Sequence, residues 1–147
     1  MKKLLVFLGF GILSCSNPDD FGLDSTQFIY TDQKWELVRM TGNIEGSETT
    51  GDEMEWQENY IFSPNGTFLK TRTTNTEIIE ATGTFEVIEK DEDMEHYLNL
   101  TYETGKSILG SCNGDGTEVL RYISIKSIPN TWNMCDGPGL EYSLVQD

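Results

Sequence analysis

The chain has 147 residues, of which 25 are acidic and 10 are basic, so its formal net charge is −15. This length accommodates one domain with a substantial hydrophobic core but not two ordinary domains. The negative charge disfavours nucleic acid and anionic lipid headgroups as partners. The acidic residues are scattered along the chain, which is typical of a solvated surface, although a basic partner or bound cations would also suit them.

The first 14 residues predict a secretory signal peptide. Two lysines precede an apolar run at residues 4–13, which is too short to span a bilayer as a helix. The tetrapeptide ILSC that ends at Cys15 resembles the lipobox of bacterial lipoproteins, in which the cysteine is acylated and becomes the new N-terminus. The resemblance implies that residues 1–14 are removed and that Cys15 anchors the protein to a membrane. An ordinary secreted protein is the alternative.

Residues 15–31 are expected to form a lipidated tether, because they are polar, contain Pro18 and show no clean hydrophobic period. Asp19 and Asp20 resemble a weak form of the acidic signal that sends lipoproteins of the Bacteroidota to the cell surface. A solvated linker explains them equally well. We therefore expect a protein of the cell envelope, anchored in the outer membrane and either periplasmic or exposed at the surface.

The remaining segment, residues 32–147, is predicted to be one domain of short strands separated by turns. The tetrapeptide SPNG at residues 63–66 favours a tight hairpin, because proline presets φ and Asn-Gly accepts positive φ. About eight strands with local turns predict an all-β fold, an antiparallel up-and-down barrel, which removes sheet edges. The expected strands are 35–40, 56–62, 67–72, 77–81, 84–88, 96–102, 107–112, 118–126, a brief pairing at 131–135, and 140–145.

The cysteines predict a disulfide. If Cys15 carries lipid, Cys112 and Cys135 remain as an even pair in an oxidising compartment. No metal or cofactor is expected, because these cysteines and the single His96 lack the spacings of zinc sites. We also expect no enzyme, since the chain has no G-x-S-x-G motif and no recognisable Ser-His-Asp arrangement.

Five short segments are hydrophobic landmarks: KWEL at 34–37, YIF at 60–62, NGTF at 65–68, GTFE at 83–86 and LNL at 98–100. In order and spacing they resemble those of lipocalin-like lipoproteins of the Bacteroidota over residues 34–146. Lipocalins typically carry a glycine two residues before the first-strand tryptophan, where this chain has Gln33 before Trp35. In lipocalins a late-strand arginine packs on that tryptophan, so the resemblance implies a cation-π contact between Trp35 and Arg121. A surface arginine paired with an acidic residue is the alternative.

The resemblance further implies a binding module for a small, apolar ligand at an open barrel mouth formed by the loop at residues 42–55. The candidate ligand-binding residues are aromatic or basic side chains of predicted strands: Trp56, Tyr60, Phe62, Arg72 and Tyr102. These side chains would instead simply fill a small barrel if it has no cavity.

A second hypothesis is an interaction or structural protein, whose filled barrel uses acidic loops against a basic protein partner. An interior pocket of several hundred Å³ favours the ligand, and a packed interior with an acidic rim favours the protein partner. In either case we expect a monomer held at the membrane by its lipid.

Overall fold

The computed structural model describes residues 31–90 and 95–146. Within these ranges no helix is long and apolar enough to cross a membrane. The predicted signal peptide, nearly all of the predicted tether and the lipidation site at Cys15 lie outside the described residues. The elements, in chain order, are β1 (Gln33–Thr41), η2 (Gly51–Glu53), β2 (Gln57–Phe62), β3 (Thr67–Thr73), β4 (Ile78–Lys90), β5 (Glu95–Tyr102), η3 (Lys106–Ile108), β6 (Thr117–Tyr122), β7 (Ile128–Pro129), η4 (Trp132–Cys135) and β8 (Gly139–Leu144).

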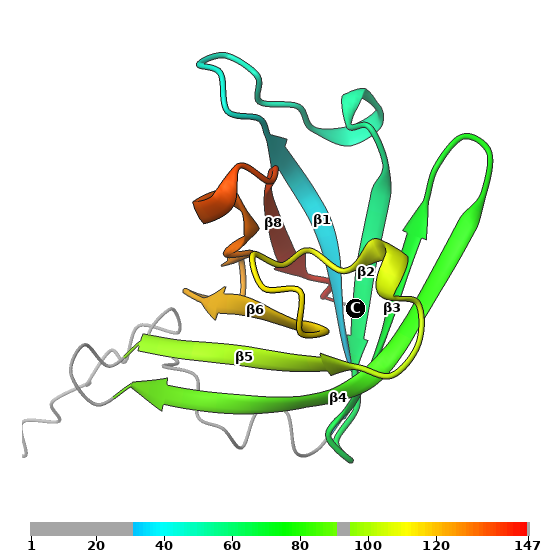
Figure 1. Cartoon of the computed structure of the whole chain (residues 1–147), viewed down its shortest axis with the longest axis vertical. Helices are drawn as coiled ribbons and strands as arrows, with labels where there is room; N and C mark the ends of the chain where they lie inside the picture. The colour runs from blue at the N-terminus through cyan, green and yellow to red at the C-terminus, as the bar shows by residue number, and fades with distance from the viewer. Residues whose placement is uncertain (1–30, 91–94, 147) are drawn as a thin grey trace, which may run out of the picture.

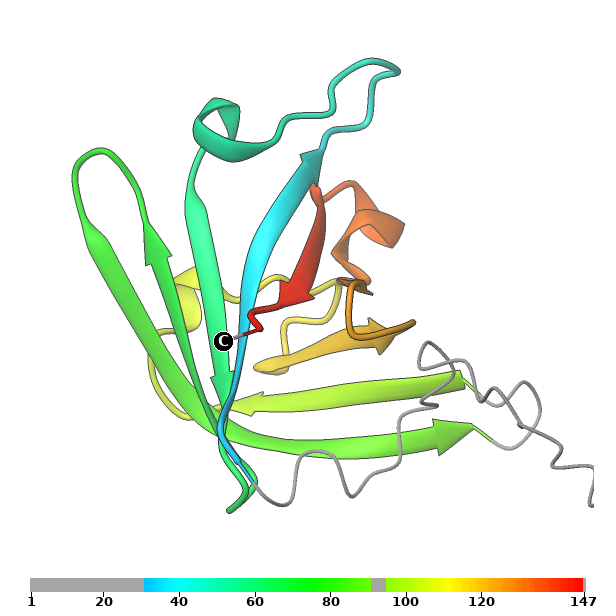
Figure 2. The ribbon, with the colours of Figure 1, turned by 180° about the vertical axis from the view of Figure 1, so that it is seen from behind.

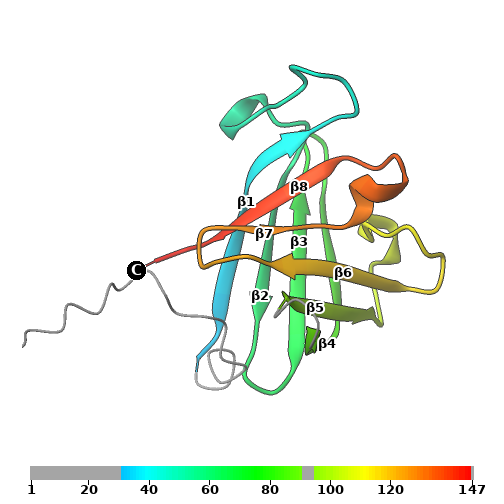
Figure 3. The ribbon, with the colours of Figure 1, turned by 90° about the vertical axis from the view of Figure 1, so that its left-hand side faces the viewer.

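Eight antiparallel strands form one sheet that curls into a nearly closed barrel (Figures 1 and 2). From β1 to β6 each strand pairs with the next, and β8 pairs with both β1 and β7. Isolated bridges from Leu120 to Asn130 and from Ser124 to Ser127 bring the β7 segment against β6, and Figure 3 shows β6, β7 and β8 side by side. The predicted all-β, up-and-down, lipocalin-like barrel of about eight strands is confirmed.

The hairpin between β2 and β3 turns where the sequence predicts it. Gly66 has φ +81°, and Asn65 accepts a hydrogen bond from the Thr67 backbone N–H at 3.1 Å. The two strands predicted at 77–81 and 84–88 are one long strand, β4, with Gly83 inside it. A side chain at Gly83 would collide with the Thr101 carbonyl and the Phe68 ring. Gly83 therefore permits close approach of neighbouring strands and does not end β4.

Three strand predictions near the C-terminal end are wrong in detail. The apolar run at 107–112 lies in η3 and an irregular segment, because Gly105 adopts a left-handed conformation that starts a 3-10 turn. The strand predicted at 118–126 ends at Tyr122, and the segment at 131–135 is the 3-10 turn η4. Pairing with β8 falls instead on Ile128 and Pro129.

The predicted disulfide is confirmed by the positions of the two cysteines. The sulfur atoms of Cys112 and Cys135 lie 2.10 Å apart, and their Cα atoms lie 5.6 Å apart. The bond connects the segment after η3 with η4. It therefore joins two non-strand segments that are 23 residues apart in sequence.

Candidate functional site: a charged cluster inside the barrel

Four charged side chains inside the barrel form what we call the charged cluster: Glu58, Lys70, Arg72 and Glu118. Successive side chains of a strand point to opposite faces, so Glu58 shares the inner face of β2 with Tyr60 and Phe62. Lys70 and Arg72 similarly share the inner face of β3 with Phe68. The side chains of Glu58 and Lys70 have no exposed surface, the Glu118 side chain also has none, and that of Arg72 is 11% exposed.

Lys70 is the centre of the charged cluster. Its Nζ lies 3.1 Å from Glu58 Oε1 and 3.2 Å from Glu118 Oε2. The same ammonium group donates to the backbone carbonyl of Ile108 in η3 at 2.9 Å. Three acceptors match the three N–H donors of a lysine, so Lys70 joins strands β2, β3 and β6 to η3.

Arg72 extends the charged cluster to Trp56. Its Nε donates to Glu58 Oε2 at 2.5 Å, and its Nη2 donates to the Ile108 carbonyl at 3.3 Å. The guanidinium carbon lies 4.3 Å from the centroid of the Trp56 ring, within the range of a cation-π contact.

Three buried tyrosines complete the cluster by donating to its carboxylates. Tyr60 donates to Glu118 Oε1 at 3.0 Å, Tyr102 donates to Glu118 Oε2, and Tyr142 donates to Glu58 Oε1 at 2.5 Å. Burial raises the pKa of Tyr60, Tyr102 and Tyr142 well above the ordinary tyrosine value, and the nearby carboxylates raise it further. All three phenols therefore remain protonated donors at neutral pH.

The cluster is balanced in charge and satisfied in hydrogen bonds. Two carboxylates face one ammonium and one guanidinium, and each carboxylate oxygen has at least one donor within reach. Removing ions from water is costly, and only a complete set of partners offsets that cost. A ligand that bound here would have to replace protein contacts of the cluster.

The five predicted ligand-binding residues lie in the barrel, but their side chains contact one another and the charged cluster. Tyr60 and Tyr102 both bond Glu118, and Arg72 stacks on Trp56. Phe62 stacks on Tyr60 with ring centroids 5.4 Å apart. Sequence reasoning missed Glu58, Lys70, Glu118 and Tyr142. Period 2 was the available signal, since Glu58 and Lys70 alternate in phase with aromatic residues on β2 and β3.

The expected contact between Trp35 and Arg121 is wrong. Arg121 is on the outer face of β6 and pairs with Glu95. Its neighbour Tyr122 points inward and meets Trp35 edge-on, with ring centroids 6.1 Å apart. Adjacent strand residues face opposite sides of the sheet. In the observed register Tyr122, and not Arg121, is therefore the residue of β6 that contacts Trp35. Arg39 is also an outer-face residue, paired with Glu48 and Glu141.

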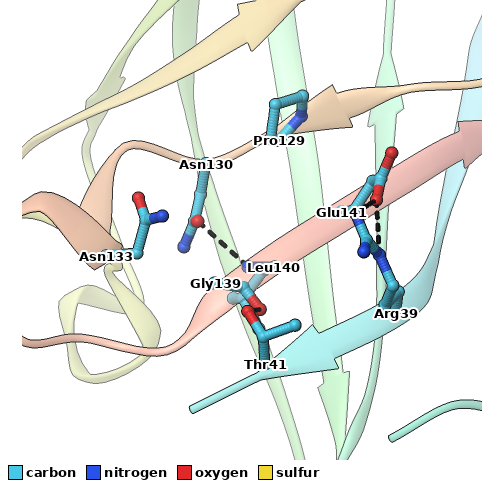
Figure 4. Close-up of a pocket in the computed structure, with 8 residues that line it drawn as sticks. All are labelled: Arg39, Thr41, Pro129, Asn130, Asn133, Gly139, Leu140 and Glu141. Carbon is cyan, nitrogen blue, oxygen red and sulfur yellow. Dashed lines mark hydrogen bonds and ion pairs between the residues drawn. The ribbon is translucent and has the colours of Figure 1, made fainter. Parts of the chain in front are cut away.

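Three depressions lie on the described part of the protein away from the centre of the charged cluster. Neither Lys70 nor any of the three cluster tyrosines lines them. One of about 290 Å³ lies at the barrel mouth, and one of about 180 Å³ lies where β1 and β2 diverge. The third, of about 100 Å³, lies beside β1, β7 and β8 (Figure 4). Arg39 and Glu141 pair there, and Asn130 accepts a hydrogen bond from the Leu140 N–H, so most of its polar lining is already bonded.

Among the described residues, no three or more His, Cys, Asp or Glu side chains are grouped to hold a metal ion. Comparisons of the chain with protein families, with curated proteins and with solved structures found no match.

Proposed function

We propose that this chain is an envelope lipoprotein, anchored through Cys15, whose packed barrel recognises a basic protein partner through its acidic mouth. The observation that carries the proposal is the charged cluster. The residues expected to hold an apolar ligand surround an ion-pair network with no exposed carboxylate or ammonium. An apolar molecule placed there would leave buried charges without partners, at a cost of several kcal/mol.

The mouth has the charge that the second hypothesis requires. Residues 42–56 contain five carboxylates and no lysine or arginine, and all five acidic residues are exposed. Exposed charge of one sign speeds the encounter with a partner of opposite sign and suppresses wrong partners. The five are Glu45, Glu48, Asp52, Glu53 and Glu55.

The test is native mass spectrometry of the full chain purified from its own envelope, beside the Cys15→Ser variant, which needs no detergent. We expect no bound small molecule in either form. We also expect a complex with a basic protein that dissociates when salt is raised, because exposed charges are screened. An apolar molecule bound at one per chain in both forms would overturn the proposal.

A second candidate function is the binding of a small polar ligand, favoured by one observation at Trp56. The indole Nε1 of Trp56 is buried, and no residue of the described ranges accepts a hydrogen bond from it. A hydroxyl or carbonyl oxygen would satisfy this N–H while the ring stays stacked on Arg72. A polar molecule that co-purifies with the wild-type chain but not with Trp56→Phe would favour this candidate.

A further inference from the structure

Two segments meet at the barrel mouth and form what we call the rim: residues 42–56 and residues 132–138. Asn43 Nδ2 donates to the backbone carbonyl of Asp136 at 3.2 Å, which ties the two segments together. In Figure 1 the first segment rises above β1 and β2, and the orange η4 turn lies lower, beside β8. The rim pocket of about 290 Å³ lies between them, lined by Met40, Thr41, Gly42, Ser47, Thr49, Glu53, Glu55 and Pro138.

The rim also carries the two most exposed large hydrophobic side chains among the described residues. Ile44 is 79% exposed and Met134 is 82% exposed. Each comes from a different segment of the rim. Ile44 directly follows Asn43, and Met134 lies two residues before Asp136, so both are close in sequence to the hydrogen bond that joins the two segments. A protein contact surface typically has a small apolar centre surrounded by polar groups.

The charge of the rim pocket favours a cation. Glu53 and Glu55 line it, and neither forms an ion pair in the described structure. The nearest basic residue on β1, Arg39, is already paired with Glu48 and Glu141. A partner cation would therefore meet negative charge that the protein itself does not neutralise.

We propose that the rim docks a short segment of a partner protein. The segment places one lysine or arginine side chain in the rim pocket beside Glu53 and Glu55, and an adjacent apolar side chain on Ile44 and Met134. This inference rests on the proposed function and names the chemistry of the partner's contact. The rim pocket, of about 290 Å³, has room for a single long side chain. The charged cluster keeps all its contacts.

The test selects a phage-displayed random dodecapeptide library on the full chain in detergent micelles. We expect enriched peptides with lysine or arginine next to leucine, isoleucine, phenylalanine or methionine. The affinity of the selected peptides is then measured for two rim variants, Glu53→Gln/Glu55→Gln and Ile44→Ser/Met134→Ser. Each should weaken binding by about tenfold, because each removes one of the two recognition elements.

Matched controls change the same residue types elsewhere on the barrel. Ile78 and Ile123 are exposed hydrophobic residues outside the rim, 69% and 55% exposed, and Glu86 and Glu103 are exposed carboxylates outside it. Ile78→Ser/Ile123→Ser and Glu86→Gln/Glu103→Gln should leave affinity within about twofold of the wild type.

Two results would overturn the inference, and they differ in what they say about the proposed function. Basic peptides that bind all four variants equally well would remove the rim as their site but leave recognition of a basic partner standing. Failure to enrich basic peptides, or enrichment of peptides without basic residues, would remove both.

Discussion

At one end of the barrel interior, Phe62 and Phe85 pack edge to face with ring centroids 4.9 Å apart, and Phe85 pairs in register with Leu100 of β5, which has no exposed surface. At the other end, Lys70 and two glutamates occupy positions that are buried just as deeply. Tyr60 belongs to both ends, because its ring stacks on Phe62 and its hydroxyl donates to Glu118. Burial alone therefore does not distinguish the two ends.

The difference lies in how each end responds to a lost contact. Apolar packing is a sum of many weak, non-directional contacts, so its loss scales with the area or volume removed. The charged cluster depends on completeness, since one missing partner leaves the others desolvated and unpaired. We infer that the apolar end tolerates small changes and that the charged end does not.

Replacing Lys70 by methionine is the strongest test of the difference between the apolar end and the charged end. Lys70→Met keeps the approximate volume but removes the one cation that pairs with Glu118 among the described residues. We expect a loss of about 3 to 5 kcal/mol in the free energy of unfolding, because a buried carboxylate loses its counter-ion. Urea denaturation at neutral pH measures it.

Two controls accompany Lys70→Met. At the apolar end Phe68→Leu should cost about 1 to 1.5 kcal/mol, as a similar-sized hydrophobic exchange does. At the surface Lys34→Met, which breaks an exposed pair with Glu36, should cost less than about 1 kcal/mol. A Lys70→Met protein as stable as the Phe68→Leu protein would contradict the all-or-none behaviour of the charged cluster.

The disulfide provides a second test of the charged end, because the segment that precedes Cys112 also contacts the charged cluster. Ile108, four residues before Cys112, accepts hydrogen bonds from both Lys70 and Arg72. Cys112→Ser/Cys135→Ser should lower the free energy of unfolding by about 3 kcal/mol, because the unfolded chain regains the freedom of a 23-residue loop. Guanidinium denaturation of the variant and of the wild type measures the difference. Equal stability of the two proteins would exclude the disulfide as a support of this end.

The sequence predicts the barrel better than it predicts the charged cluster. Alternating strands and the Asn65-Gly66 turn indicate an antiparallel barrel, because period and turn chemistry are local properties. For the same reason the sequence predicts Trp56, Tyr60 and Phe62 inside the barrel. It does not predict Glu58 and Lys70 there, because a charged residue in an amphipathic strand is ordinarily assigned to solvent. Their inner position becomes evident only when the partners from three strands are known.

The Arg121 prediction fails for a related reason. Which side of the barrel a strand residue faces depends on register, and a shift of one residue reverses every side chain. The run at 118–126 has apolar residues on both faces, so its pattern does not fix the inner set. The structure assigns Glu118, Leu120 and Tyr122 to the interior, which makes Arg121 an outer residue.

Tyr142→Phe tests the smallest difference between the two ends. At neutral pH the change removes one hydrogen bond to Glu58 and should cost about 1 to 2 kcal/mol.

Since burial raises the pKa of Tyr142 and of Tyr60 in the folded state, each phenol keeps its proton above pH 10 while the unfolded chain loses it. Stability is therefore unaffected by these groups below about pH 10 and falls above it, by about 1.4 kcal/mol per pH unit for each tyrosine. Tyr102 and Tyr122, whose pKa values burial also raises, steepen the wild-type slope further. Urea denaturation between pH 9.5 and 11 should show a shallower slope in Tyr142→Phe than in the wild type, because one of these tyrosines is lost. Phe62→Leu should shift the whole curve without changing its slope, because no titrating group is lost at the apolar end. An unchanged slope in Tyr142→Phe would mean that this phenol ionises equally in the folded and unfolded states. Water would then reach the charged end of the folded barrel, which would contradict the burial of its contacts.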